Sequence, residues 1–190
     1  MNKICMVVLL VCIICAFCGC EEHYEKKREE VAAAHNNDAQ TVILPNGDMI
    51  ALMDTRTSIE EKIGTSEIKN EFVKNSWVYD GIEVSYFSIG DEEYASAIYI
   101  EKPKCITYSG VEIGDHHEVI SDLPVLHSYS DYNTIEKRDK THVLTAIDLN
   151  GSPLTQEEID NRKGEVLIYI SYSYSDETIV DISISRQIND

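Results

Sequence analysis

Hydrophobic and polar residues alternate most regularly in two parts of the chain. The first comprises WVYDGIEVSYFS and EYASAIYIE, which flank the turn residues Gly90 and Asp91. A period of two places the apolar side chains on one face of a β-strand, so these segments predict a β-hairpin with one buried face. The residues of that face are Ile82, Val84, Tyr86, Ile98 and Ile100.

A second hairpin is predicted near the C-terminus, where EVLIYISYSYS and TIVDISISR flank Asp176 and Glu177. The two hairpins match in sequence: Ser85-Tyr86 recurs as Ser171-Tyr172, and apolar positions recur at similar spacing. In this match Ile82, Val84 and Tyr86 correspond to Ile168, Ile170 and Tyr172, and Ile98 and Ile100 correspond to Ile182 and Ile184. Val166 and Val180 complete the predicted apolar face.

Shorter elements surround each hairpin. TVIL and MIALM flank an Asn46-Gly47 turn signal and predict two short strands. KCITYSG and THVLTAIDL predict further strands. Three short helices are predicted from capping patterns, in which a Ser, Thr or Asp precedes a Glu by three residues. The capping pairs are Ser58 and Glu61, Asp115 and Glu118, and Thr155 and Glu158.

These elements predict an α+β fold in which short helices pack on one face of one or more antiparallel sheets. Because each hairpin follows a strand and a helix, we interpret residues 41–103 and 104–190 as a tandem duplication of one unit. The second copy contains an insertion at about residues 125–164, where features peculiar to this protein are expected. The alternative is that the hairpins resemble each other because all amphipathic hairpins do.

The N-terminal 40 residues have a different pattern. Lys3 precedes an uncharged run of residues 4–17, which suits an export signal but is shorter than the roughly 20 residues that span a bilayer. Small Gly19 before Cys20 suits cleavage at that point, and the stretch Phe17, Cys18, Gly19, Cys20 resembles the processing motif of bacterial lipoproteins.

That resemblance implies a signal peptide of residues 1–19 and a lipid anchor on Cys20, which would hold the protein at the extracytoplasmic face of the cell membrane. A diacylglyceryl or palmitoyl-type anchor with two chains gives stable attachment. Residues 21–40 are charged and polar without an apolar stripe, and are interpreted as a tether. An uncleaved helix and a secreted form are the alternatives.

A second, weaker resemblance involves GVEIGDHHEVISDLP and the C-terminal hairpin. Their order is similar to that of the small α+β modules of the β-lactamase-inhibitor and SmpA/BamE type, and covers about residues 104–190, with 41–103 as a possible second copy. The resemblance implies a non-catalytic protein that acts through contacts across its sheet. Pro124 stands where many such modules have Gly.

The chain is strongly acidic, with 16 Lys and Arg against 34 Asp and Glu. Removal of residues 1–19 would take away one lysine and no acid. The resulting field repels nucleic acid and favours neutral or cationic partners, so we expect no nucleic-acid binding. Acids that only maintain solubility are the simpler interpretation.

Candidate chemical residues are few. Cys105 is the one thiol outside the N-terminal segment and is interpreted as a buried apolar residue, with a cysteine hydrolase as the alternative. Adjacent His116 and His117 diverge by about 100° on a helix, which disfavours a shared metal ion. Asp148 and Glu157 fit positions of a calcium loop, but its first ligand is missing. No metal or cofactor is therefore predicted.

The sequence contains no nucleophile elbow, phosphate-binding loop or dinucleotide fingerprint, so an enzyme is not expected. Envelope hydrolysis by Cys105 or by a carboxylate pair of the run Asp91, Glu92, Glu93 remains the alternative, as does a calcium-stabilised surface module. The expected function is a non-catalytic binding module at the cell envelope. By strand alternation Tyr99 and Tyr169 face away from the core, and we predict them to contact a protein or cell-wall partner.

Overall fold

The computed structural model describes residues 40–133 and 138–189. The predicted signal peptide, the predicted lipidation site Cys20 and the predicted tether lie outside these residues, except for Gln40. Neither of the α-helices within them has the length and apolar composition needed to cross a membrane.

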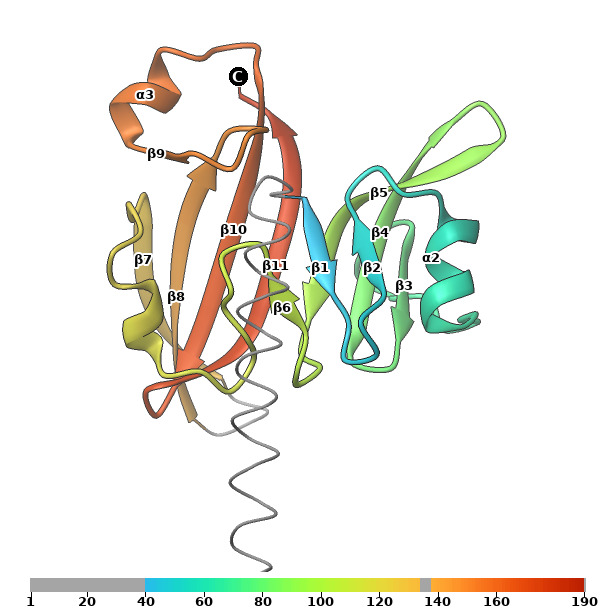
Figure 1. Ribbon diagram of the computed structural model, residues 1–190, viewed down its shortest axis with the longest axis horizontal. Helices are drawn as coiled ribbons and strands as arrows, with labels where there is room; N and C mark the ends of the chain where they lie inside the picture. Colours follow the sequence, from blue (N-terminus) through green and yellow to red (C-terminus); the bar gives the residue numbers. More distant parts are fainter. Residues whose placement is uncertain (1–39, 134–137, 190) are drawn as a thin grey trace, which may run out of the picture. The chain divides into compact units, whose positions relative to one another are not determined.

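Eleven strands, two α-helices and one 3-10 helix are present in the described residues (Figure 1). The first part contains β1 (Thr41–Ile43), β2 (Met49–Ala51), α2 (Arg56–Ile63), β3 (Ser76–Tyr79), β4 (Ile82–Ile89) and β5 (Glu92–Ile100). The second contains β6 (Ile106–Thr107), η1 (His117–Ile120), β7 (His127–Asn133), β8 (Arg138–Ile147), β9 (Pro153–Leu154), α3 (Gln156–Asp160), β10 (Val166–Ser175) and β11 (Thr178–Ile188).

A large antiparallel sheet contains both predicted hairpins. Its strands follow the order β3-β4-β5-β11-β10-β8-β7, and β9 pairs with β8. The second strands of the two hairpins are neighbours, with Ile98 opposite Ile184 and Ile100 opposite Ile182. One face of this sheet, the core face, is therefore continuous across both hairpins.

A small sheet of β2, β1 and β6 packs on the core face (Figure 1). Val42 and Ile50 of the small sheet, Ile59 of α2, and Ile98 and Ile170 of the large sheet all belong to one buried cluster. Burial of such side chains contributes about 1.5–3 kcal/mol each relative to exposure. The core thus lies between the two sheets, with α2 closing one side.

The predicted α+β class is wrong. The protein is mostly β, with 49% strand and 12% helix, and its short helices do not form a layer across the large sheet. The expected helix at DHHEVISDL is only the 3-10 turn η1, because the Asp115 carboxylate accepts the backbone N–H of Glu112 instead of capping a helix. The predicted insertion adds strands β7, β8 and β9 to the large sheet.

Two local predictions also differ from the structure. The segment WVYDGIEVSYFS is two strands, β3 and β4, because the chain reverses at Asp80-Gly81. In β11 an irregularity at Val180 interrupts the alternation, so Ile179 is fully buried and Val180 is not. A bulge adds one residue to a strand and moves the following side chains to the opposite face.

Several elements are as predicted. The Asn46-Gly47 turn joins β1 to β2. Thr155 and Glu158 form the complete capping box of α3. The helix after β2 is also present, but its N-cap is Thr55, whose side chain accepts the backbone N–H of Ser58.

The hairpin turns show how the two hairpins correspond. Each turn has two residues, between Ile89 and Glu92 and between Ser175 and Thr178. Counted from these turns, Ile82 occupies the position of Ile168, as in the sequence match. Ile98 occupies the position of Ile184, two residues from its predicted counterpart Ile182.

Candidate functional site

The face of the large sheet opposite the core, here called the outer face, carries both tyrosines predicted to make contacts. Tyr99 of β5 lies between Glu83 of β4 and Ser183 of β11. Tyr169 of β10 lies between Ala146 of β8 and Ser185 of β11. Both rings are half-buried. Small side chains separate them, so the outer face presents aromatic rings beside a low, hydroxyl-rich strip.

The hydroxyl group of Tyr99 is held by acidic neighbours. It donates a hydrogen bond to Glu101 at 3.2 Å. Burial raises the pKa of Tyr99 well above its ordinary value of 10.0, and the negative charges of Asp181 and Glu101 raise it further. The phenol therefore stays protonated and acts as a donor, and the ring is only partly buried.

Tyr169 has a more apolar environment. It packs against a second buried cluster, formed by Ala146, Leu154, Ile159 and Leu167, with which β9 and α3 cover one end of the outer face. Within the described residues, the main buried cluster thus lies on the core face of the large sheet, and this smaller apolar cluster lies on its outer face. Tyr169 lies at the border between that cluster and the hydroxyl-rich strip.

A buried ion pair lies on the same face. The Lys140 ammonium of β8 is 3.2 Å from the Asp181 carboxylate of β11, and both side chains are buried. Removing two charges from water is costly, and only a close partner offsets the cost. This pair ties β8 to β11 across the intervening strand β10.

A His lies within hydrogen-bonding distance of an Asp and a Ser from the two neighbouring strands, and the sequence does not predict this group. His142 of β8 lies between Asp131 of β7 and Ser173 of β10, with its Nε2 atom 3.2 Å from Asp131 and its Nδ1 atom 2.8 Å from Ser173 Oγ. Tyr129 stacks on the imidazole at a centroid distance of 4.8 Å. Only the register of three strands brings these residues together, so no spacing within the sequence could reveal them.

This arrangement differs from the serine-hydrolase triad in two respects. There, the Nε2 atom faces the serine and the Nδ1 atom faces the aspartate, the reverse of the orientation at His142. A nucleophile must also reach its substrate, whereas Ser173 is only 2% exposed. The three side chains serve as a cross-strand hydrogen-bonded connection rather than as a nucleophilic site.

Cys105, the alternative nucleophile, is fully buried next to β6. Burial raises the pKa of its thiol to about 11. The thiolate is the reactive form, so a raised pKa makes the side chain unreactive at neutral pH. Among the described residues, no hydrogen bond joins Cys105 to a histidine.

The histidine and calcium candidates have other contacts. The rings of His116 and His117 lie 4.8 Å apart in a tilted arrangement, and His117 stacks on Tyr174 at 4.6 Å. The Asp148 carboxylate accepts the backbone N–H groups of Asn150 and Ser152, which closes the turn before β9. The part of the chain that the structure describes contains no group of three or more His, Cys, Asp or Glu side chains placed to hold a metal ion.

The acidic run Asp91, Glu92, Glu93 consists of the second residue of the β4–β5 turn and the first two residues of β5, beside α2. Glu93 is 3.1 Å from the guanidinium group of Arg56, which also contacts Glu60 at 2.8 Å and lies 3.7 Å from the centre of the Trp77 ring. Charge-assisted hydrogen bonds and the aromatic face thus fix Arg56. These contacts attach the turn to the helix.

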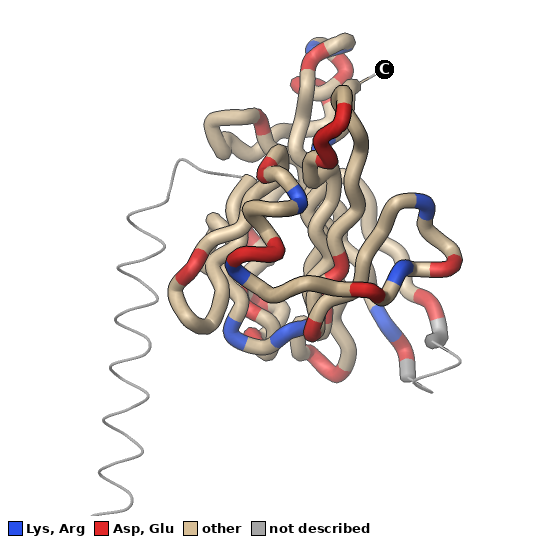
Figure 2. Tube along the Cα trace, turned by 90° about the vertical axis from the view of Figure 1, so that its right-hand side faces the viewer, with Lys and Arg blue, Asp and Glu red and all other residues tan. Residues whose placement is uncertain are grey.

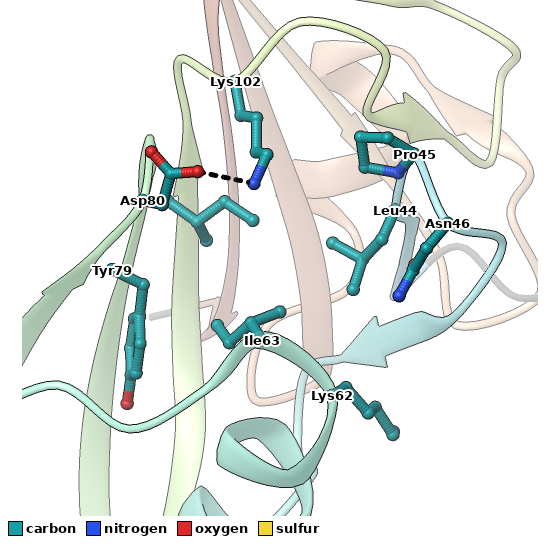
Figure 3. A pocket seen from close by; sticks show the side chains of 9 residues that line it. Leu44, Pro45, Asn46, Lys62, Ile63, Tyr79, Asp80 and Lys102 are labelled. Carbon is teal, nitrogen blue, oxygen red and sulfur yellow. Dashed lines mark hydrogen bonds and ion pairs between the residues drawn. The ribbon is translucent and has the colours of Figure 1, made fainter.

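A pocket next to the end of α2 was not predicted. It has a volume of about 210 Å³ and combines apolar walls with charged groups at its rim (Figure 3). We call it the α2 pocket. Its lining residues are Leu44, Pro45, Asn46, Lys62, Ile63, Tyr79, Asp80, Ile82 and Lys102. They come from four separate segments, so only tertiary structure could bring them together.

No protein-family model, curated protein or solved structure matches this chain.

Proposed function

We propose that this protein is a non-catalytic binding module displayed at the extracytoplasmic face of the cell membrane by a lipid anchor on Cys20. The outer face of the large sheet is its contact surface. The observation that carries this proposal is the position of Tyr99 and Tyr169 on one sheet face, half-buried and separated by small side chains. Tyrosine offers a large, amphipathic contact area at low entropic cost.

The negative net charge of the chain favours neutral or basic partners. Acidic residues exceed basic ones about twofold, and Figure 2 shows acidic positions distributed over strands and loops rather than gathered in one block. On the outer face, Glu83 and Glu101 flank Tyr99. We therefore propose a protein partner with a neutral or basic contact segment. For a basic segment, the association rate should fall as salt is added, because salt screens its attraction to the acidic chain.

Photocrosslinking in the native organism tests the contact surface. A photoreactive phenylalanine analogue is introduced in place of Tyr99 or Tyr169, and in place of Phe72 as the control. Phe72 is 96% exposed and lies outside the large sheet. We expect a specific protein adduct from positions 99 and 169 and none from position 72. Equal labelling at all three positions, or no adduct at 99 and 169, contradicts the proposed surface.

The anchor has a separate test. Cells that express the chain are fed an alkyne-tagged fatty acid, and the purified protein is analysed by mass spectrometry. We expect a diacylglyceryl group on Cys20 at the new N-terminus, and loss of the tag and of membrane association in Cys20→Ser. A free thiol at Cys20 or an intact Met1 would rule out this form of attachment.

A further inference from the structure

The α2 pocket has apolar walls, and the ion pair of Lys102 with Asp80 lies at its rim. Leu44, Ile63 and Ile82 supply aliphatic groups, and the ring of Tyr79 closes one side (Figure 3). The Tyr79 hydroxyl lies 3.0 Å from Tyr86 and 3.3 Å from Glu60, so it is already engaged. An occupant therefore meets aliphatic and aromatic carbon at the walls.

The two lysines of the pocket differ in how firmly they are held. The Lys62 ammonium is 3.0 Å from Asp54, a carboxylate that also accepts the backbone N–H of Ala51. Lys102 contacts Asp80 at 2.9 Å, and Asp80 is 91% exposed. An exposed ion pair contributes only about 0–1 kcal/mol. Lys102 can thus exchange Asp80 for another anion at little cost.

The size of the pocket limits its occupant. A volume of about 210 Å³ is smaller than the roughly 300–1,000 Å³ of sites for drug-sized ligands. The pocket has room for a group of a few carbon atoms. Apolar walls with an exchangeable ammonium at the mouth suit an aliphatic group that ends in a negative charge.

We propose that the α2 pocket binds a small aliphatic carboxylate, whose carbon chain contacts Leu44, Ile63 and Ile82 and whose carboxylate accepts hydrogen bonds from Lys102. This inference does not depend on the outer face or on the lipid anchor. The same chemistry is present in a free branched-chain acid and in the C-terminal leucine of a peptide. The ligands of the test distinguish these sources.

Methyl NMR of the full-length chain, labelled at its Ile and Leu methyl groups, measures binding directly. The probes are 4-methylpentanoate, N-acetyl-leucine and N-acetyl-leucine amide, which lacks the carboxylate. We expect saturable shifts of the Leu44, Ile63 and Ile82 methyl groups with a Kd of about 1 mM for at least one acid and none for the amide. Ile188, which is 63% exposed at the end of β11, is the control for non-specific association.

The two acids identify the source. Binding of both indicates that the C-terminal residue of a peptide fits the pocket. Binding of 4-methylpentanoate alone indicates a free acid, because the acetamido group is then excluded. Both results support the proposal. Absence of saturable shifts up to about ten times the expected Kd, or equal binding of the amide, overturns it.

Two substitutions test the ionic contact in opposite directions. Lys102→Met keeps the aliphatic stem and removes the charge, and should weaken binding about tenfold. Asp80→Asn removes the competing carboxylate and should strengthen binding about threefold. Lys163→Met removes one exposed lysine beyond α3 and so controls for net charge. It should leave the Kd unchanged.

The Asp80→Asn variant keeps the test decisive if Lys102→Met alters the fold, because Asp80 is almost fully exposed and Asn also suits a turn before glycine. Weaker binding in Asp80→Asn overturns the proposal, since the carboxylate would then be a ligand contact rather than a competitor. An equal loss in Lys163→Met and Lys102→Met also overturns it.

Discussion

At the scale of single residues, the least expected feature is a charged pair inside a sheet face. Lys140 and Asp181 are both buried and 3.2 Å apart. Neither could be identified from the sequence, because a Lys at the end of the charged run EKRDK and an Asp in TIVDISIS look like exposed positions of amphipathic strands. The irregularity at Val180 sets the face on which Asp181 lies.

Loss of one partner of this pair should be strongly destabilising. Lys140→Met leaves the Asp181 carboxylate buried without its 3.2 Å partner, and we expect the free energy of unfolding to fall by about 3–5 kcal/mol. The double variant Lys140→Met with Asp181→Leu should recover most of the loss, because no buried charge remains. Chemical denaturation of the three proteins measures both effects, and a loss below about 1 kcal/mol in the single variant contradicts them.

The buried thiol of Cys105 should make the stability of the protein depend on pH in the alkaline range. Its folded pKa is raised by burial from 9.0 to about 11. The unfolded thiol ionises first, so the stability contributed by the buried neutral thiol is fully present below pH 9 and is lost as pH rises to about 11. We expect the stability difference between the native chain and Cys105→Ala to narrow over this interval in denaturation measurements. A constant difference would contradict a buried, titrating thiol.

At the scale of elements, the β3–β4 turn positions the rim of the α2 pocket. Gly81 has φ of 69°, in the left-handed region that glycine adopts readily. A Cβ atom there would lie 3.0 Å from the Cβ atom and 3.2 Å from the Cα atom of Lys102. The turn therefore requires glycine for its backbone conformation and also for the approach of the segment after β5.

Gly90 differs from Gly81 in having a positive φ without a close approach of another segment, so the two glycines separate the effect of backbone conformation from the effect of space. Gly90 also has positive φ, of 63°, but a Cβ atom there would meet nothing within 4 Å. Gly90→Ala should cost about 1–2 kcal/mol of stability through backbone strain alone. Gly81→Ala should cost about 1–3 kcal/mol more, because the Lys102 segment must move. Thermal unfolding of both variants tests this order, and equal losses would show that the close approach relaxes freely.

At the scale of the whole molecule, the predicted boundary between residues 103 and 104 falls inside two sheets. β5 of the first half pairs with β11 of the second in the large sheet, and β6 of the second half pairs with β1 of the first in the small sheet. Each half alone would expose strand edges and half of the shared core. Such edges and apolar faces are sites of aggregation.

We therefore expect that residues 41–103 and 104–190, expressed separately, do not fold, and that they form a folded complex when combined. Dispersion of amide resonances in NMR spectra measures this. Independent folding of either fragment, with a dispersed spectrum and a cooperative thermal transition, would show that the two halves are autonomous units. The intact chain should unfold in one transition because the core is continuous.

The sequence alone determined the local elements. The alternation of the two hairpins, the Asn46-Gly47 turn, and the capping box of Thr155 and Glu158 depend on neighbours within a few residues. All are present, except that the alternation in β11 is interrupted at Val180. The prediction of a helix at Asp115 was wrong. The same capping pattern is compatible with a turn, in which the Asp115 carboxylate accepts the backbone N–H of the earlier residue Glu112. Short signals of this kind do not fix helix length.

Only the tertiary structure decided the strand partners, and with them the fold class and the sites. Alternation places Tyr99 and Tyr169 on the face away from the core, but the pairing of β5 with β11 places them on the same sheet. The contacts of His142, the Lys140–Asp181 pair and the α2 pocket join residues from distant segments. Periodicity records which side of a strand is buried, whereas the identity of the neighbouring strand depends on packing energies summed over the whole core.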